Sequence, residues 1–238
     1  MHYPRIIAHR CGGALAPENT LVGLRIAARL GCRGVEFDAM LSADDVPLLI
    51  HDETLERTTS GRGQVGATLA AEMTRLDAGS HHHRAFAGEP APTLQQALAV
   101  CGELGLWANV EIKPSAGREG ETGRIVARLV AGYGNVLLSS FSKDALREAA
   151  LAAERLPRAL LVDSAADDWL GSLSDTGADA LHIAAELATP ERLQTLNAAG
   201  VPVACYTVNR RDAAAQLFAM GVRAVFTDRP DIWAPGEM

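Results

Sequence analysis

Apolar runs with the length of strands alternate along this chain with segments of helical apolar spacing, and the connections between them are short. The helical segments include residues 94–104 and 143–154. The strand candidates are the runs at residues 6–9, 34–41, 47–51, 107–112, 136–138, 159–162, 180–183, 201–208 and 224–226. Repeated βα units of this length predict a parallel sheet that is buried on both faces.

The strand candidates number one more than the eight of a (β/α)8 barrel. Only residues 42–46 separate the second run from the third, whereas a parallel crossover needs about a dozen residues. This short connection predicts an antiparallel hairpin, whose second arm lies outside the barrel. Pairing about the turn would then place His51 nearly opposite Glu36. Eight strands remain for the barrel.

We therefore expect an α/β fold, a TIM (β/α)8 barrel in which residues 1–238 form one domain. An insertion at about 42–93 would follow the second barrel strand, because residues 52–93 are irregular and show no helical stripe. The GxGxxG pattern at 61–66 follows no strand and opens no clear helix, so we expect turn glycines there. Adjacent imidazoles do not converge on one ion, so we expect 81–83, three histidines in a row, to lie in a solvated loop.

Charged and imidazole side chains stand at the ends of four apolar runs. They are His9 with Arg10, Glu36 with Asp38, His51 with Asp52, and Glu111 with Lys113. Parallel α/β folds place their chemistry at the carboxyl ends of strands. A histidine titrates near neutral pH, so His9 and His51 are candidates for acid and base catalysis, against the alternative of core histidines. His182 lies inside a run, and we expect it to be a hydrogen-bonded barrel histidine.

The two carboxylates of the second strand are the candidate metal ligands. Glu36 and Asp38 are two residues apart, so their side chains point the same way. Burying both is costly unless they are neutralised, and one alternative is a structural ion pair with Arg10. A third acid at another strand end, Glu111, favours a hard divalent cation, because Mg²⁺ and Ca²⁺ take oxygen ligands.

The charge of this candidate site suits a phosphodiester. Three carboxylates and a dication sum to −1, and Arg10 with Lys113 brings the sum to +1. A phosphodiester carries one negative charge and would neutralise the site, whereas a neutral sugar would not. The net charge of the chain is −7, which argues against nucleic acid or an anionic membrane as a partner. We expect a small-molecule substrate and a protein that is a monomer or a homodimer.

Together these residues resemble the glycerophosphodiester phosphodiesterase family. The matching stretches, in family order, are His9-Arg10, residues 17–20, Glu36-Phe37-Asp38, residues 47–52, residues 55–59, Glu111-Ile112-Lys113, residues 139–141, residues 206–209 and Thr227-Asp228. Residues 77–80 and 86–90 look like the compact cytosolic bacterial enzymes of the family. Cys11 departs from the pattern, which usually has glycine there. A cysteine would be strained if that position requires a positive φ.

The resemblance implies a TIM barrel with one divalent cation (Mg²⁺ or Ca²⁺, or Mn²⁺) on Glu36, Asp38 and Glu111. It implies that Arg10 and Lys113 hold the phosphate oxygens. His9 and His51 would share the acid and base roles, in an order that the resemblance leaves open. The nucleophile would be a substrate hydroxyl, which gives a cyclic intermediate, or a water bound to the metal.

The expected reaction is hydrolysis of glycerophosphodiesters, such as glycerophosphocholine or glycerophosphoethanolamine, to an alcohol and glycerol 3-phosphate. The alternatives are a phospholipase-like hydrolase of lipid phosphodiesters and a barrel that binds phosphodiesters without cleaving them. Aromatic residues make up only 5% of the chain, and no amphipathic membrane-binding stretch is evident, which disfavours the lipid hydrolase.

The cysteines and the apolar runs bear on location. The four cysteines form no CxxC pair and no zinc spacing, so we expect free thiols in a reducing compartment. The first strand begins within about five residues of the N-terminus, leaving no room for a signal peptide. No run is long enough to span a bilayer. The expected location is the cytoplasm.

Overall fold

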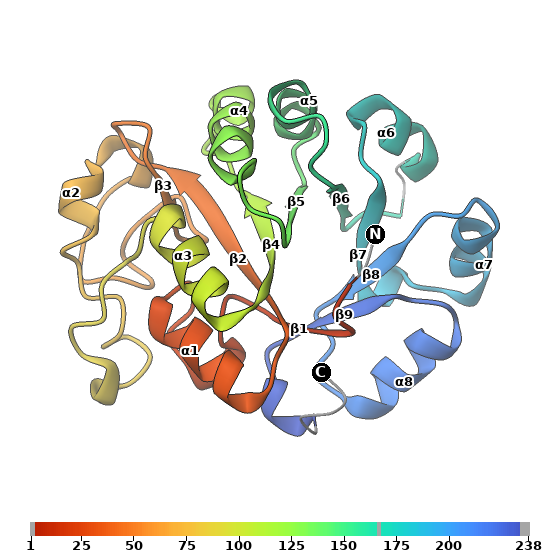
Figure 1. Ribbon diagram of the computed structural model, residues 1–238, viewed down its shortest axis with the longest axis horizontal. Coiled ribbons are helices and arrows are strands. Elements are labelled where there is room, and N and C mark those ends of the chain that lie inside the picture. Colours follow the sequence, from red (N-terminus) through yellow and green to blue (C-terminus); the bar gives the residue numbers. More distant parts are fainter. Residues whose placement is uncertain (1–2, 166–167, 234–238) are drawn as a thin grey trace.

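The computed structural model describes residues 3–165 and 168–233, and helices surround a closed parallel barrel in it (Figure 1). The strands are β1 (Ile6–Ala8), β2 (Gly34–Leu41), β3 (Pro47–Leu49), β4 (Trp107–Ile112), β5 (Val136–Ser140), β6 (Arg158–Val162), β7 (Ala180–Ala184), β8 (Val203–Tyr206) and β9 (Ala224–Thr227). The helices are α1 (Leu21–Leu30), α2 (Ala70–Met73), α3 (Leu94–Leu104), α4 (Glu119–Val130), α5 (Lys143–Ala152), α6 (Trp169–Thr176), α7 (Pro190–Ala198) and α8 (Arg211–Ala219).

The sheet closes on itself in the order β1-β9-β8-β7-β6-β5-β4-β2, and a parallel β1–β2 pairing completes the ring. β3 pairs antiparallel with β2, with Ala39 opposite Leu49 and Leu41 opposite Pro47, and lies outside the ring. The predicted eight-stranded barrel with a hairpin arm is therefore confirmed. The largest difference between predicted and observed strand bounds is at β8, which is shorter than the run 201–208. The Val201 amide still donates a hydrogen bond to the last turn of α7, so the strand begins later.

Two apolar layers hold the barrel. Every residue of β2, β5, β6 and β7 is buried, as parallel strands covered on both faces require. Inside the ring, small and large side chains fill the axis, among them Ile7, Leu137 and Phe226. His182 is fully buried there, and its Nε2 lies 3.1 Å from the Tyr3 hydroxyl, so the predicted hydrogen-bonded barrel histidine is confirmed.

The first helix shows which of two adjacent polar residues caps it. Thr20 accepts a hydrogen bond from the Gly23 amide at 3.2 Å, so Thr20 is the N-cap of α1. The side chain of Asn19 therefore does not cap α1, and it points toward the barrel instead. Gly31 ends the helix with φ of 96°, a left-handed conformation that suits glycine.

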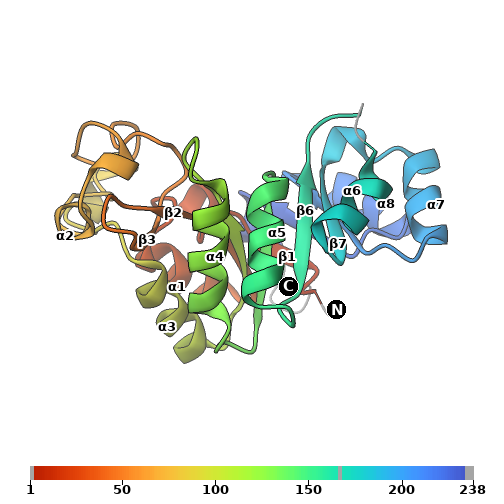
Figure 2. The ribbon, with the colours of Figure 1, turned by 90° about the horizontal axis from the view of Figure 1, so that it is seen from above.

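Residues 50–93 lie beside the barrel, where Figures 1 and 2 show them in orange and yellow near the β2–β3 hairpin. They contain the short helix α2, which the expectation of an irregular segment missed. Four residues are too few to show a helical stripe, and the Asp44 carboxylate stabilises α2 by accepting from the Ala70 amide at 2.8 Å. A small apolar cluster lies beneath it, formed by Met40, Leu48, Ile50, Leu55, Val65, Ala70 and Met73.

Other expectations for this segment hold. His81, His82 and His83 are exposed, as expected of a solvated loop. Gly63 has φ of 104°, which is typical of a turn glycine. Elsewhere in the chain, all four cysteines are buried and none forms a disulfide, as expected.

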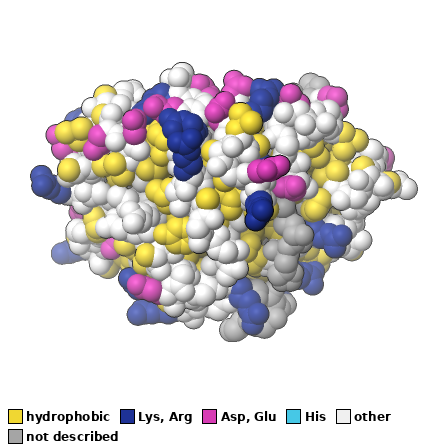
Figure 3. Space-filling view, turned by 45° about the horizontal axis from the view of Figure 1, so that its top comes forward, with side chains coloured by type: hydrophobic (Ala, Val, Ile, Leu, Met, Phe, Trp, Pro, Cys, Tyr) yellow, Lys and Arg dark blue, Asp and Glu magenta, His cyan; other side chains and the backbone are white. Residues whose placement is uncertain are grey.

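Within the described ranges, no helix has the length and apolar character needed to cross a bilayer. On the face shown in Figure 3, acidic and basic side chains are scattered among each other rather than gathered by sign.

Candidate active site

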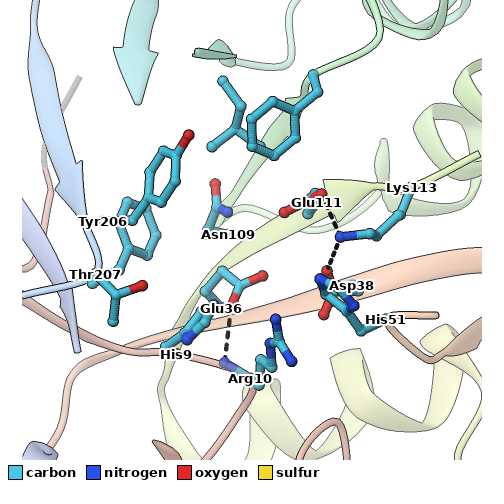
Figure 4. Close-up of a pocket in the computed structure, with 13 residues that line it drawn as sticks. His9, Arg10, Glu36, Asp38, His51, Asn109, Glu111, Lys113, Tyr206 and Thr207 are labelled. Carbon is cyan, nitrogen blue, oxygen red and sulfur yellow. Dashed lines mark hydrogen bonds and ion pairs between the residues drawn. The ribbon is translucent and has the colours of Figure 1, made fainter. Parts of the chain in front are cut away.

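Three carboxylates converge where β2 and β4 end (Figure 4). The parallel register places Asp38 beside Glu111, and Glu36 lies two residues earlier on the same face of β2. One oxygen from each carboxylate lies within 4.8 Å of the others, and Glu36 and Asp38 are 4% and 1% exposed. The folded chain thus brings Glu36, Asp38 and Glu111 together as a compact group of oxygen donors.

This acidic group has little positive charge close to it. Burial first, and then the charge of Asp38, raise the pKa of both Glu36 and Glu111. Lys113 Nζ lies 3.5 Å from Asp38 Oδ1 and 3.4 Å from Glu111 Oε1, which supplies one positive charge for three carboxylates. Buried oxygen donors that lack neutralisation are the donor set that a hard divalent cation prefers. The residues therefore fit such an ion.

The turn after β1 fixes the position of Glu36. The Arg10 amide donates to Glu36 Oε2 at 2.8 Å, and the Cys11 amide donates to the Glu36 carbonyl at 2.7 Å. Arg10 and Cys11 achieve this with φ of 50° and 74°. Cys11 therefore occupies a left-handed position, which is the strained case that the sequence raised.

Asn19 fixes Asp38 in a similar way. Its Nδ2 donates to Asp38 Oδ2 at 2.8 Å, and its Oδ1 accepts from the Asp38 amide at 3.1 Å. The Asn19 amide in turn donates to the Arg10 carbonyl at 3.1 Å. One buried asparagine thereby ties the acidic group to the turn after β1.

The alternative of an ion pair between Arg10 and the strand carboxylates is wrong. The left-handed turn directs the guanidinium to Glu18, with Nη1 3.1 Å from Glu18 Oε1. Arg10 Nε is buried and has no hydrogen-bond partner within residues 3–165 and 168–233. Arg10 nevertheless lines the pocket, so part of its guanidinium faces the site.

His9 is oriented by a carboxylate from the last strand. Its Nδ1 lies 2.7 Å from Asp228 Oδ1, and its Nε2 lies 3.9 Å from Glu36 Oε2. Asn209 donates to Asp228 Oδ2 at 3.0 Å, and the Ala14 amide holds the Asp228 carbonyl at 2.7 Å. Burial by itself lowers the pKa of His9, but the bond to Asp228 and the charge of Glu36 outweigh it and raise the pKa.

His51 is oriented in a parallel way by its own neighbour. The Ile50 amide donates to the Asp38 carbonyl at 3.2 Å, so the hairpin returns the chain to the end of β2. His51 Nδ1 lies 2.6 Å from Asp52 Oδ1. Burial is the largest cause that lowers the pKa of His51, ahead of the opposing charge of Asp38. The predicted return of His51 to the neighbourhood of Glu36 is confirmed, since both line one pocket.

The pocket is a cavity of about 170 Å³ at the carboxyl ends of the strands. The structure brings all of the sequence-predicted residues to it, namely His9, Arg10, Glu36, Asp38, His51, Glu111 and Lys113. Its remaining lining was not predicted and comprises Asn109, Phe141, Leu161, Tyr206, Thr207 and Phe226. Charged groups come from β1, β2, the hairpin and β4, and apolar side chains cover the opposite side.

Two orienting carboxylates, Asp52 and Asp228, stand in stretches that the sequence analysis singled out, but they were given no role in the site. The signal for Asp52 is its position directly after a strand-end histidine. The signal for Asp228 is its position directly after β9, the neighbour of β1 in the closed barrel.

The chain is similar to known proteins over nearly its full length. Residues 9–232 match the model of the glycerophosphoryl diester phosphodiesterase family. A glycerophosphodiester phosphodiesterase of Caldanaerobacter subterraneus subsp. tengcongensis is 31% identical over 230 residues, covering 95% of this chain and 94% of the relative.

Solved structures show the same likeness. An Oleispira antarctica phosphodiesterase in complex with the product sn-glycerol-3-phosphate is 35% identical, with a TM-score of 0.92 over 96% of this chain and 94% of that chain. A glycerophosphodiester phosphodiesterase from Agrobacterium tumefaciens is 28% identical, with a TM-score of 0.80 over 97% and 98% of the two chains.

Proposed function

The chain belongs to the glycerophosphoryl diester phosphodiesterase family and shares its enzymatic activity, and from this premise we propose its substrates and mechanism. The proposed substrates are glycerophosphodiesters such as glycerophosphocholine and glycerophosphoethanolamine, cleaved to an alcohol and sn-glycerol 3-phosphate. The observation that carries this proposal is the buried carboxylate group flanked by two histidines, each held by its own aspartate. The similar Oleispira enzyme that holds sn-glycerol-3-phosphate supports the choice of product.

Glu36, Asp38 and Glu111 would hold one divalent cation, Mg²⁺ or Ca²⁺ or Mn²⁺. The burial of Glu36 and Asp38, the raised pKa values of Glu36 and Glu111 and the oxygen donors of all three residues support this assignment. When bound, the cation would orient the phosphate and offset the negative charge that develops on its oxygens.

Arg10 and Lys113 would bind the phosphate oxygens. Both line the pocket, and both stand next to the carboxylate group, Lys113 directly and Arg10 through its amide. With the cation, these two residues bring the summed charge of the site to +1, which a singly charged phosphodiester neutralises. The apolar side of the pocket would face the uncharged carbon chain of the substrate.

His9 and His51 would divide the proton transfers. Each imidazole is held at Nδ1 by an aspartate, so Nε2 is the nitrogen left for the substrate. One histidine would take the proton of the attacking hydroxyl as its oxygen bonds to phosphorus. The other would protonate the alcohol oxygen as its bond to phosphorus breaks. If the attacking hydroxyl is that of water, this step completes the hydrolysis. If it belongs to the substrate, the step leaves a cyclic phosphodiester, which water opens in a second step, so either route consumes one water.

We also propose that residues 1–238 act as one domain and that the insertion at about 42–93 helps to select the alcohol group. The support is that His51 reaches the pocket from this segment. Four buried cysteines that form no disulfide suit a reducing compartment, which supports a place in the cytoplasm.

The test is release of glycerol 3-phosphate from glycerophosphocholine, measured with a coupled dehydrogenase assay. We expect activity with an added divalent cation, its loss with excess EDTA, and its return on adding back Mg²⁺, Mn²⁺ or Ca²⁺. A wild-type protein that releases no glycerol 3-phosphate with any of these ions contradicts the proposed substrate. Unchanged activity in EDTA contradicts the metal assignment alone.

A further inference from the structure

Beyond the pocket lining, one guanidinium joins two carboxylates that lie behind the site. Arg57 donates to Asp52 from Nε at 2.5 Å and from Nη2 at 3.0 Å. It donates to Glu18 from Nη1 and Nη2 at 2.8 Å each. Each carboxylate therefore accepts hydrogen bonds from two nitrogens of Arg57, which is the bidentate geometry of the arginine–carboxylate pair.

Each of these carboxylates holds a different residue of the site. Asp52 Oδ1 lies 2.6 Å from His51 Nδ1, and Glu18 Oε1 accepts from Arg10 Nη1 at 3.1 Å. The result is an unbroken path of hydrogen bonds from His51 to Arg10, with Arg57 at its centre. The three parts of the chain that meet in it are the turn after β1, the loop before α1 and the segment after β3.

The charges along this path explain why its centre must be a cation. Asp52 and Glu18 both bond the same guanidinium, so without it two negative groups would share one small volume. The hydrogen bonds from Arg57 are the largest cause that lowers the pKa of Asp52. At Glu18 burial and the charge of Asp38 raise the pKa, but the bonds from Arg57 and the charge of Arg10 outweigh them and lower the pKa.

A carboxylate without a proton can only accept hydrogen bonds, and this determines the state of its partner. His51 must donate to Asp52 from Nδ1, so in its neutral form the imidazole presents Nε2 as an acceptor. Arg10 likewise has one end of its guanidinium fixed on Glu18, which sets the direction of the rest. The same central residue thus bears on both proton transfer and phosphate binding.

We propose that Arg57 is a positioning residue of the reaction, which sets the tautomer of His51 through Asp52 and the direction of Arg10 through Glu18. This inference rests on the proposed function, because it takes His51 to transfer a proton and Arg10 to hold the phosphate.

The first experiment measures kcat and KM for glycerophosphocholine in Arg57→Ala. We expect a loss of about 10-fold or more in kcat/KM, typical of removing a group that orients a site residue, shared between lower kcat and higher KM. Asp52→Asn should reproduce the fall in kcat, and Glu18→Gln should reproduce the rise in KM. Arg57→Lys should recover little of the lost activity, because an ammonium group cannot form bidentate hydrogen bonds with two carboxylates.

Arg147 offers a matched control. It also bridges two carboxylates, those of Asp144 and Asp175, and its side chain is 41% exposed against 45% for Arg57. Unlike Asp52 and Glu18, these two carboxylates hold no pocket-lining residue among those that the structure describes. Arg147→Ala should leave both kinetic constants unchanged. Millimolar guanidinium chloride should restore part of the activity of Arg57→Ala, and sodium chloride at equal ionic strength should not.

A double-mutant cycle separates positioning from a merely structural role. If Arg57 acts on kcat through His51, the kcat cost of Arg57→Ala should vanish in the His51→Ala background. Costs that multiply in the double variant overturn the inference, and so do kinetic constants of Arg57→Ala equal to those of Arg147→Ala. A wild type that is inactive overturns the proposed function instead, so the two failures are distinguishable.

Discussion

Two histidines of this barrel, one partly buried at its mouth and one fully buried in its interior, show opposite pKa shifts. His9 lies at the end of β1, with Asp228 and Glu36 as neighbours, and its pKa is raised. His182 lies within β7 against the Tyr3 hydroxyl, and burial lowers its pKa to about 3. Burial is the largest single cause at both positions, and it acts downward at both.

The difference teaches that carboxylates can outweigh burial at His9, whereas burial prevails at His51 in spite of Asp38, and acts alone at His182. A neutral hydroxyl is the hydrogen-bond partner of Nε2 of the interior imidazole, and it does not favour protonation of the ring. At the mouth, the ends of β1, β2, β4 and β9 bring carboxylates together, and Asp228 and Glu36 raise the pKa of the neighbouring His9. The mouth therefore holds several titratable groups whose pKa values shift one another, whereas the interior histidine is neutral and packs against uncharged neighbours.

The largest expected effect comes from removing a charge from the mouth. Glu111→Gln should lower the metal-dependent rate by about 10³-fold, since a metal ion supplies several kcal/mol and each tenfold step in rate is about 1.4 kcal/mol. Glycerol 3-phosphate release over a titration of Mn²⁺ measures the effect, and Glu103→Gln on the exposed side of α3 is the matched control. A Glu111→Gln enzyme that saturates with Mn²⁺ as the wild type does would remove Glu111 from the metal site.

The second effect comes from the two mouth histidines. His9→Ala and His51→Ala should each lower turnover by about 10²-fold or more, as removal of a general acid or base does. Phosphate-analogue binding should persist in both variants. Near-normal turnover in either variant would exclude that histidine from the mechanism, and His81→Ala in the exposed loop is the control.

The leaving group can then assign the two roles. An activated phosphodiester with a nitrophenol leaving group needs no proton at departure. The variant whose loss shrinks on this substrate lacks the general acid, and the variant whose loss persists lacks the base. Equal losses on both substrates would contradict a division of roles between His9 and His51.

How far the sequence predicts this site depends on how local the determining contacts are. β2 was predicted to the residue, because its apolar run and its two inward carboxylates lie on one strand with a period of two. The pairing of His9 with Asp228 spans 219 positions and exists only when the barrel closes, so no local pattern signals it. The direction of Arg10 follows from its positive φ, which residue type alone does not predict.

The interior histidine makes a smaller, thermodynamic prediction. The pKa of His182 in the folded chain is about 3, below its usual 6.5. Between pH 6.5 and pH 3, His182 therefore binds a proton in the unfolded chain but not in the folded chain. Stability contributed by neutral His182 is present above pH 6.5 and is lost as the pH falls, by up to about 1.4 kcal/mol per pH unit.

Urea unfolding of His182→Gln at a series of pH values from 7.5 down to 4.5 measures this slope. The variant should lose less stability than the wild type on acidification, whatever its stability at neutral pH, because glutamine does not titrate. His81→Gln should keep the wild-type slope, since that side chain is exposed. Parallel curves for the wild type and His182→Gln would contradict a neutral interior histidine.

The smallest expected effect concerns the residue behind the mouth, Cys11. Its φ of 74° favours glycine, but its side chain is fully buried and its Cβ occupies the space that Gly23 leaves open. In Cys11→Gly, relief of about 1–2 kcal/mol of strain in the left-handed backbone should nearly cancel the stability lost with the buried side chain. The greater entropy of glycine in the unfolded chain adds about 0.5–1 kcal/mol to the cost. Cys11→Gly should therefore change the free energy of unfolding by less than about 1 kcal/mol. It should leave kcat within about twofold, because both backbone N–H hydrogen bonds to Glu36 remain.

Cys11→Val should be clearly destabilised, since a branched side chain tolerates a positive φ poorly. Equal stability of the glycine and valine variants would show that the mouth does not depend on this backbone turn.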